Sequence, residues 1–273
     1  MQIQDKFDQI IAKNDSLVCV GLDSDFNKLP EHLKNSANPQ FEFNKAIIGA
    51  THDLVCAYKP NSAFYEAQGP KGIEQLKMTC DYIRQNYPEI PIILDAKRAD
   101  IGNTNVGYVT FAYDYLGVDA ITLHPYLGSE AIKPFLERED KAAIILCRTS
   151  NPGAGEFQDL ISDGQKLYQV VAKRVVNEWN KNGNCFLVVG ATYPGELAEV
   201  RKIAGEMTLL VPGIGAQGGE VEETVKAGLN SQKAGMIINS SRGIIFASGG
   251  EDFAEKAREE TMKLRDEINK YRV

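Results

Sequence analysis

The sequence predicts an α/β protein with the fold of a (β/α)8 (TIM) barrel in a single domain. Two observations lead to this prediction: eight short, nearly all-apolar runs recur along the chain, and amphipathic segments separate them. Runs that are apolar at every position indicate strands buried on both faces, as in parallel sheets with helical crossovers. Eight β-α units within 273 residues match the strand number and length of such a barrel.

The eight apolar runs are the predicted strands, and apolar residues spaced by three and four predict helices between them. The predicted strands are residues 17–22, 54–58, 92–94, 120–123, 142–147, 186–189, 208–211 and 236–238. The predicted helices include residues 72–86, 103–115, 164–181, 195–204, 218–228 and 252–271. No linker or low-complexity tract interrupts the pattern, so residues 1–273 are expected to form one domain. An open, doubly wound sheet remains an alternative, because periodicity alone cannot show whether a sheet closes.

Composition narrows the possible partners. The chain has 30 basic and 37 acidic residues, a net charge of −7, and no Lys/Arg-rich block, so no nucleic-acid partner is expected. The longest apolar runs are of strand length and no signal pattern opens the chain, so no membrane partner is expected either. Five scattered cysteines without a C-x-x-C pair are expected to be reduced core thiols in the cytoplasm. Three histidines without ligand spacing predict no metal site.

An unusual concentration of charge follows the third apolar run. Asp95, Lys97, Arg98 and Asp100 place four ionisable groups within six positions. Side chains alternate along a strand, so Asp95 and Lys97 are expected to face the barrel mouth together. A rim salt bridge would explain this pair alone.

Two further charges change that interpretation. Lys59 and Asp23 follow other predicted strands, and the carboxyl ends of barrel strands meet at one rim. A cluster of alternating charges there costs desolvation energy and is seldom assembled for stability alone. The sequence therefore predicts a small-molecule site at this rim.

The last two loops suit a phosphate group. Barrels commonly bind phosphate with the loops after strands seven and eight, through backbone N–H groups. Here these loops are residues 213–219, rich in glycine, and 239–243, which contain Arg242, a side chain that can bind phosphate through two hydrogen bonds.

Residues 213–218 also read G-x-G-x-x-G, the dinucleotide fingerprint, so a nicotinamide-dependent oxidoreductase is an alternative. Two observations argue against it: the motif opens the seventh β-α unit, and no ribose-binding acid ends the next strand.

The run D-A-K-R-A-D-I, residues 95–101, resembles the D-x-K-x-x-D-I signature of the orotidine 5′-phosphate decarboxylase family. Other segments resemble that family's motifs in order. They are V-G-L-D ending at Asp23, Y-K-P-N around Lys59, S-N-P-G from Ser150, residues 211–219, and S-R-G at 241–243. The resemblance covers essentially the whole barrel, and the long segment 24–40 is similar to the longer bacterial branch.

The resemblance implies decarboxylation of orotidine 5′-phosphate to UMP and CO2, in de novo pyrimidine biosynthesis, with no cofactor and no metal. It implies that Lys97 is the electrostatic partner and proton donor, and that Asp95 lies beside the departing carboxylate and orients Lys97. Lys59 and Asp23 would bind ribose hydroxyls, and Lys59 would complete a Lys59/Asp95/Lys97/Asp100 network.

The family also implies a homodimer with shared active sites, in which Asp100 and Thr104 reach the partner's site. Ser150 would read the pyrimidine and Gln217 would close over the substrate. The remaining substrate contacts implied by the resemblance are Gly218, Ser241 and Arg242.

Two further alternatives follow from the family pattern. A Mg²⁺-dependent sugar-phosphate decarboxylase of the same superfamily shares D-x-K-x-x-D, but an acid would be expected there in place of Lys59. A catalytically inactive binding barrel would be expected to lack one of the four network charges, and none is missing.

Overall fold

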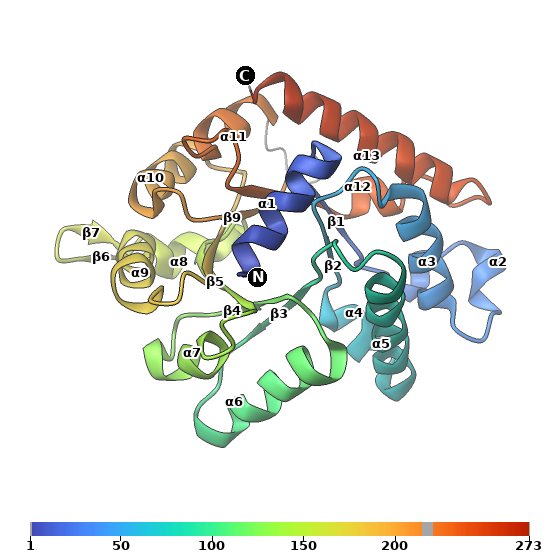
Figure 1. Cartoon of the computed structure of the whole chain (residues 1–273), viewed down its shortest axis with the longest axis horizontal. Helices are drawn as coiled ribbons and strands as arrows, with labels where there is room; N and C mark the ends of the chain where they lie inside the picture. Colours follow the sequence, from blue (N-terminus) through green and yellow to red (C-terminus); the bar gives the residue numbers. More distant parts are fainter. Residues whose placement is uncertain (1, 215–220, 273) are drawn as a thin grey trace.

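The computed structural model describes residues 2–214 and 221–272, and its centre is a sheet of eight parallel strands (Figure 1). The strands are β1 (Val18–Gly21), β2 (Ala57–Lys59), β3 (Ile93–Arg98), β4 (Ala120–Leu123), β5 (Ala142–Arg148), β8 (Cys185–Val189), β9 (Leu209–Pro212) and β10 (Met236–Ser240). Their order is β2-β1-β10-β9-β8-β5-β4-β3.

The two outer strands of this order, β2 and β3, meet and close the sheet. Parallel bridges pair Tyr58 with Ile92 and Asn61 with Asp95. The Tyr58 amide donates to the Pro91 carbonyl at 3.0 Å, and the Asp95 amide donates to the Pro60 carbonyl at 2.9 Å. The predicted (β/α)8 barrel is therefore confirmed, and the alternative of an open, doubly wound sheet is wrong.

Helices surround the barrel (Figure 1). They are α1 (Ile3–Asn14), α2 (Glu31–Lys34), α3 (Pro39–Thr51), α4 (Ser62–Glu66), α5 (Gly69–Asn86), α6 (Gly102–Val109), α7 (Gly128–Leu136), α8 (Gly155–Gln158), α9 (Leu167–Arg174), α10 (Pro194–Ala204), α11 (Val221–Gly228), α12 (Arg242–Ile245) and α13 (Phe253–Lys270). Two π-helical segments, Thr110–Leu116 and Val175–Trp179, continue α6 and α9, and 3-10 turns lie at Phe26–Lys28 and Pro152–Ala154. No helix in the described parts of the chain is long and apolar enough to span a membrane.

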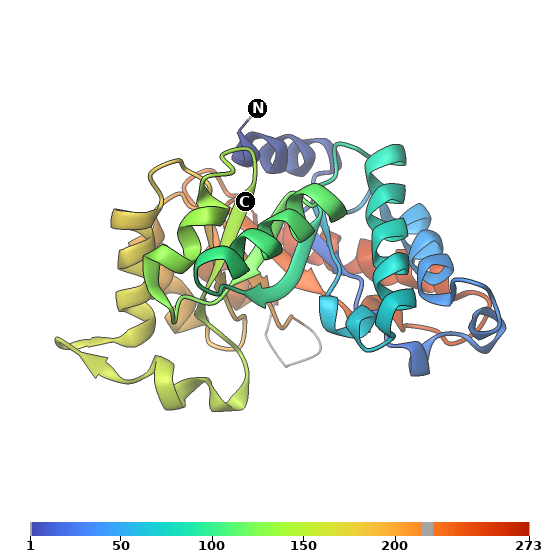
Figure 2. The same ribbon diagram turned by 90° about the horizontal axis from the view of Figure 1, so that it is seen from below.

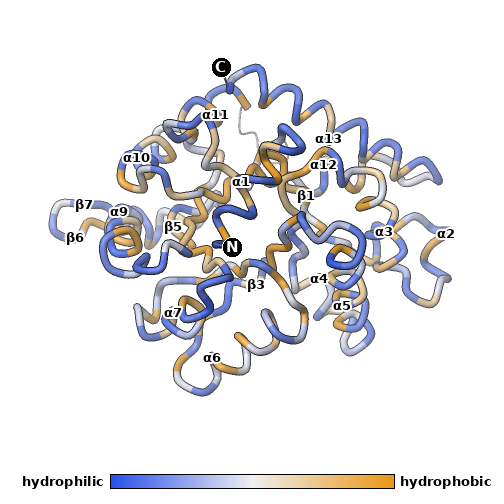
Figure 3. Tube along the Cα trace, in the orientation of Figure 1, coloured by the Kyte–Doolittle hydropathy of each residue, from blue (hydrophilic) through white to orange (hydrophobic). Residues whose placement is uncertain are grey.

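Burial follows the predicted pattern. The strands are the most hydrophobic part of the trace and the outer helix faces are hydrophilic (Figure 3). On α5, for example, Leu76, Cys80 and Ile83 are fully buried at spacings of four and three, so one helical face packs on the sheet. All five cysteines are buried and unpaired, as expected for core thiols.

Helix α1 covers the end of the barrel where the strands begin. Its Phe7 is fully buried and meets Phe186 of β8 edge-to-face, with ring centroids 5.4 Å apart. Lys6 pairs with Asp119, immediately before β4, at 2.7 Å. In Figure 2, α1 lies at one end of the molecule and the segment around α8 at the other. Because α1 covers the end where the strands begin, a site can form at the opposite end, where the strands finish.

Several predicted boundaries were wrong. The helix predicted at 164–181 begins only at Leu167, because a hairpin of β6 (Ile161–Ser162) and β7 (Gln165–Lys166) precedes it. Asp163 and Gly164 form its two-residue turn with φ of 50° and 74°, as a type I′ turn requires. The strand predicted at 92–94 continues to residue 98, so Asp95, Lys97 and Arg98 lie on the strand itself and Asp100 follows it. The first residues of the helix predicted at 218–228 lie outside the described residues.

Candidate active site

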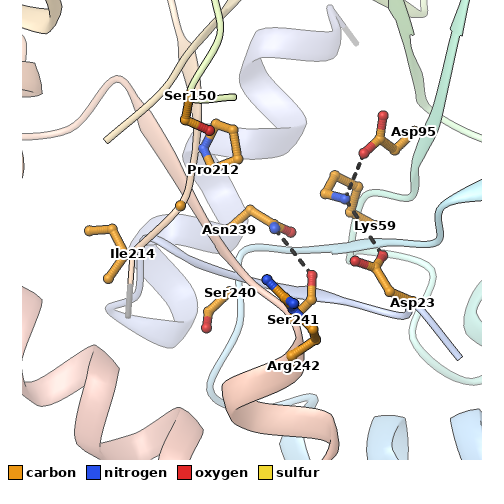
Figure 4. Close-up of a pocket in the computed structure, with 11 residues that line it drawn as sticks. Asp23, Lys59, Asp95, Ser150, Pro212, Ile214, Asn239, Ser240, Ser241 and Arg242 are labelled. Carbon is orange, nitrogen blue, oxygen red and sulfur yellow. Dashed lines mark hydrogen bonds and ion pairs between the residues drawn. The ribbon is translucent and has the colours of Figure 1, made fainter. Parts of the chain in front are cut away.

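Charged side chains from three neighbouring strand ends meet in the barrel mouth. Lys59 Nζ at the end of β2 lies 3.0 Å from Asp95 Oδ2 on β3 and 3.9 Å from Asp23 Oδ1, which follows β1 (Figure 4). Lys97 Nζ lies 2.6 Å from the other carboxylate oxygen, Asp95 Oδ1. The structure thus gathers four of the residues singled out in the sequence into one chain of alternating charge.

The backbone that carries Lys97 departs from the regular alternation expected of a strand. Pairing of β3 with β4 shifts register between Leu94 and Arg98. Within this bulge Lys97 has φ of 48°, in the left-handed region that side-chain-bearing residues rarely adopt. The Lys97 side chain still reaches Asp95 and is half exposed, whereas that of Lys59 is only 4% exposed. Lys97 is therefore the lysine accessible to a ligand.

Electrostatic attraction decides the ionisation of the buried pair. Burial alone would raise the pKa of Asp95, but the nearby Lys59 and Lys97 ammonium groups outweigh it and hold that pKa well below its usual range. Burial likewise opposes charge on Lys59, but Asp95 and Asp23 raise its pKa above its usual value. Both groups are therefore charged near neutral pH, and neither could lose its partner without leaving a buried charge.

Two adjoining cavities open above this cluster. A smaller one of about 160 Å³ extends from Asp23 to the start of α12, and a larger one of about 430 Å³ lies over β3 to β9. Four residues line both cavities: Lys59, Asp95, Ser150 and Pro212. Combined, the space is of the size that small-molecule sites have.

The two cavities have different walls. Ser241 and Arg242 line the smaller cavity, on the side away from Asp95 (Figure 4). The larger cavity is lined by the apolar residues Leu146, Val188 and Leu210 as well as by Lys97.

Other predicted site residues do not join the cluster. Asp100 caps its own loop, with Oδ1 accepting from the Ile101 amide at 2.7 Å, and makes no ion pair with any described residue. Thr104 is exposed on α6. Gln217 and Gly218 lie outside the described residues. Within one chain, therefore, some but not all of the described predicted site residues line the two cavities.

Three polar residues of the site had no role predicted from the sequence. Asn61 donates to Asp95 Oδ2 at 3.3 Å, and Thr122 of β4 donates to Asp95 Oδ1 at 3.0 Å. Asn239 of β10 lines the smaller cavity, and its buried Oδ1 accepts no hydrogen bond from the described parts of the chain. Asn61 stands in the Y-K-P-N motif and Asn239 opens the predicted loop 239–243, so both could have been noticed, but Thr122 lies inside an apolar strand run that gave no signal.

A closed (β/α)8 barrel with a buried lysine-aspartate cluster in a cavity at the carboxyl ends of its strands defines an α/β-barrel enzyme. The chain belongs to the Orotidine 5′-phosphate decarboxylase / HUMPS family, whose model matches residues 16–257.

Known proteins resemble the chain over most of its length. It is 48% identical to the orotidine 5′-phosphate decarboxylase of Janthinobacterium sp. (strain Marseille), over 89% of each chain. It is 52% identical to that of Herpetosiphon aurantiacus, over 87% of this chain and 86% of the relative. Among solved structures, Leishmania donovani OMP decarboxylase has a TM-score of 0.83 and 39% identity, with 97% and 99% covered. Leishmania donovani UMP synthase has a TM-score of 0.89 and 40% identity, and this chain spans 57% of it.

The depressed pKa of Asp95 generates a prediction about acid stability. Its ionised form favours the folded state, so this contribution is complete above the unfolded-state pKa of about 3.9 and is lost as the pH falls through the lower folded-state pKa. The difference in the free energy of unfolding between wild type and Asp95→Asn should therefore shrink as the pH falls below 4. The expected decrease is more than about 1.4 kcal/mol, the equivalent of one pKa unit. Urea unfolding between pH 7 and 2.5 measures this.

The exposed turn residue Asp163 provides the matched control. Asp163→Asn removes an exposed carboxylate and should change the free energy of unfolding at pH 7 by less than about 0.5 kcal/mol. A difference between wild type and Asp95→Asn that stays constant from pH 7 to 2.5 would contradict the assigned pKa direction.

Proposed function

We propose that this protein decarboxylates orotidine 5′-phosphate to UMP and CO2, a step of de novo pyrimidine biosynthesis, without a cofactor. The observation that carries the proposal is the accessible Lys97 ammonium, 2.6 Å from the ionised, 13% exposed carboxylate of Asp95, in a cavity with apolar lining. The relatives named above, about half identical to this chain, support it through the reaction that their names state.

The reaction needs a cation and a proton at one ring carbon. When the bond from C6 to the carboxylate breaks, CO2 leaves and the electron pair stays on C6, in the ring plane, where the pyrimidine π system cannot delocalise it. Lys97 would stabilise this carbanion electrostatically and then transfer its proton to C6, giving UMP. The neutral Lys97 amine regains a proton from solvent.

Asp95 would act on the substrate as well as on Lys97. An anion fixed beside the substrate carboxylate repels the ground state more than the transition state, in which that charge is leaving. The carboxylate is held from both sides, because Lys59 and Asn61 bind Oδ2 while Lys97 and Thr122 bind Oδ1. It therefore cannot turn away when the substrate carboxylate approaches.

The two cavities suit the two ends of the nucleotide. The apolar lining of the larger cavity suits the pyrimidine ring, with Ser150 at its edge to hydrogen-bond the ring amide. Asp23 Oδ1, buried and without a hydrogen-bond donor among the described residues, can accept from a ribose hydroxyl beside Lys59. Ser241 and Arg242 would bind the phosphate, together with Gln217 and Gly218 of the preceding loop.

Lys59 argues against the metal-dependent alternative. Its ammonium lies between the Asp23 and Asp95 carboxylates, at 3.9 and 3.0 Å, where a divalent cation would need those oxygens. Mg²⁺ binds through oxygen ligands, and a buried ammonium among them would repel it. The residues therefore favour the metal-free reaction over a Mg²⁺-dependent sugar-phosphate decarboxylase.

We also propose a homodimer in which Asp100 and Thr104 complete the partner's site. Both residues lie beside exposed apolar side chains of α6 and of the segment before α7, two helices that pack together. The exposed apolar residues are Ile101, Val106, Tyr126 and Leu127. Exposed large apolar side chains gathered on neighbouring segments are typical of a subunit interface.

We further propose that residues 1–273 act as one domain. One hydrophobic cluster runs from Ile3 on α1 to Ile268 on α13, which supports this. The unpaired buried cysteines support a reducing compartment such as the cytoplasm.

The proposed function is tested with purified protein and orotidine 5′-phosphate in EDTA, following absorbance and confirming UMP by chromatography. Wild type should form UMP. Lys97→Ala should lose about four orders of magnitude in kcat, because it lacks both proton donor and cation, while UMP binding and the unfolding transition remain. Absence of turnover in EDTA together with Mg²⁺-dependent turnover of a sugar phosphate would refute the proposal, and full activity of Lys97→Ala would refute the role of Lys97.

The role of Arg242 is tested by removing its guanidinium. Arg242→Ala should raise KM for orotidine 5′-phosphate by about 10- to 100-fold, the loss of one or two charge-assisted hydrogen bonds. Turnover of the unphosphorylated nucleoside should change much less. Equal losses on the two substrates would rule out a phosphate contact.

Shared sites are tested by mixing inactive variants. A 1:1 mixture of Lys97→Ala and Asp100→Ala should recover up to about a quarter of wild-type activity, because half of the dimers are hybrids and each hybrid has one intact site. Lys97→Ala mixed with Asp95→Asn is the control and should recover none, because both residues lie on β3 of one chain. No recovery in the first mixture would show that Asp100 acts in its own subunit.

A further inference from the structure

One buried hydroxyl of β4 joins three atoms of the strand that carries Asp95 and Lys97. Thr122 is 1% exposed. Its Oγ1 accepts from the amides of Ala96 and Lys97 at 3.1 and 3.0 Å, and donates to Asp95 Oδ1 at 3.0 Å. A hydroxyl has one proton and two lone pairs, so these three contacts use its full hydrogen-bonding capacity.

The bulge in β3 explains why the backbone needs this hydroxyl. Regular pairing with β4 ends after Leu94–Ile121 and resumes only at Arg98–Leu123. The amides of Ala96 and Lys97 fall within the interruption, and the Thr122 oxygen accepts from both. A left-handed residue other than glycine costs about 1–3 kcal/mol and persists only where its surroundings fix it. Thr122 supplies a fixed contact at Lys97, whose φ is 48°.

The same hydroxyl sets the rotation of the Asp95 carboxylate. Oδ2 is bound by Lys59 at 3.0 Å and by Asn61 at 3.3 Å. Oδ1 is bound by Lys97 and by Thr122, of which Lys97 is a long, half-exposed side chain and Thr122 is rigid and buried. Without the hydroxyl, Oδ1 would be bound only by the half-exposed Lys97 side chain.

We propose that Thr122 is a positioning residue that places Lys97 and Asp95 together in the geometry that the reaction needs. Thr122 lines the larger cavity, but its hydroxyl is fully used by the contacts to Ala96, Lys97 and Asp95, so it acts through this strand. The inference rests on the proposed decarboxylase function, because its readout is the turnover of orotidine 5′-phosphate. Displacement of a reacting group by about 1 Å can cost about 100-fold in rate, which sets the scale of the effect.

The test compares Thr122→Val, which keeps the shape and removes the hydroxyl, with Thr122→Ser, which keeps the hydroxyl. Thr122→Val should lower kcat by about 10- to 100-fold, with KM and the affinity for UMP within about twofold of wild type. Thr122→Ser should stay within about threefold of wild-type kcat.

A matched control is Thr261→Val on α13, a buried threonine whose hydroxyl donates to the Ala257 carbonyl at 2.7 Å, in a helix outside the site. Its kcat should be unchanged. If Thr122→Val does not fold, Thr122→Ala against Thr122→Ser gives the same comparison, because these two differ by a single oxygen.

Three results would overturn the inference. They are wild-type kcat in Thr122→Val, equal kcat in the Ala and Ser variants, and a loss of kcat that only follows the unfolded fraction. Failure of wild type to form UMP would refute the proposed function itself, and so is distinct from these outcomes.

Discussion

The ion pair between Lys59 and Asp95 is the interaction on which the rest of the structure depends. It spans β2 and β3, the two strands that close the barrel through isolated bridges. Lys59 is buried and Asp95 is mostly buried, and each has a second partner, Asp23 for Lys59 and Lys97 for Asp95. Burying charge is costly, and the attraction repays it only when the geometry is good. The same contacts therefore hold β2 against β3, where the barrel closes, and bring the charged residues of the site together.

The two ends of the barrel have different roles: one is packed and stabilises the fold, and the other carries the candidate active site. At the end where strands begin, α1 inserts Phe7 against Phe186 and covers the core. At the other end, polar side chains replace apolar ones and cavities replace packing. The left-handed conformation of Lys97 lies at this second end. Strain there is tolerated because the packed end supplies the stability, as in barrel enzymes generally.

The sequence alone predicted the barrel and the cluster of Asp23, Lys59, Asp95 and Lys97, because strand periodicity and strand-end position are local signals. The prediction from sequence failed at the Asp163-Gly164 turn, where a local turn signal was overlooked. It also failed where the cause is a contact between strands. Thr122 reads as an ordinary strand residue, and its role depends on a bulge in a different strand. The roles proposed for Asp100 and Thr104 involve a second chain.

Lys59 also has an evolutionary consequence. It satisfies the two carboxylates that would otherwise serve as oxygen ligands of a divalent cation. Replacing it with a neutral residue leaves two anions facing each other, and replacing it with an acid changes the local charge by two units at once. Because a neutral or acidic replacement of Lys59 alone changes the charge between these carboxylates, exchange of the ammonium for a metal ion in this barrel would require compensating changes elsewhere in the site.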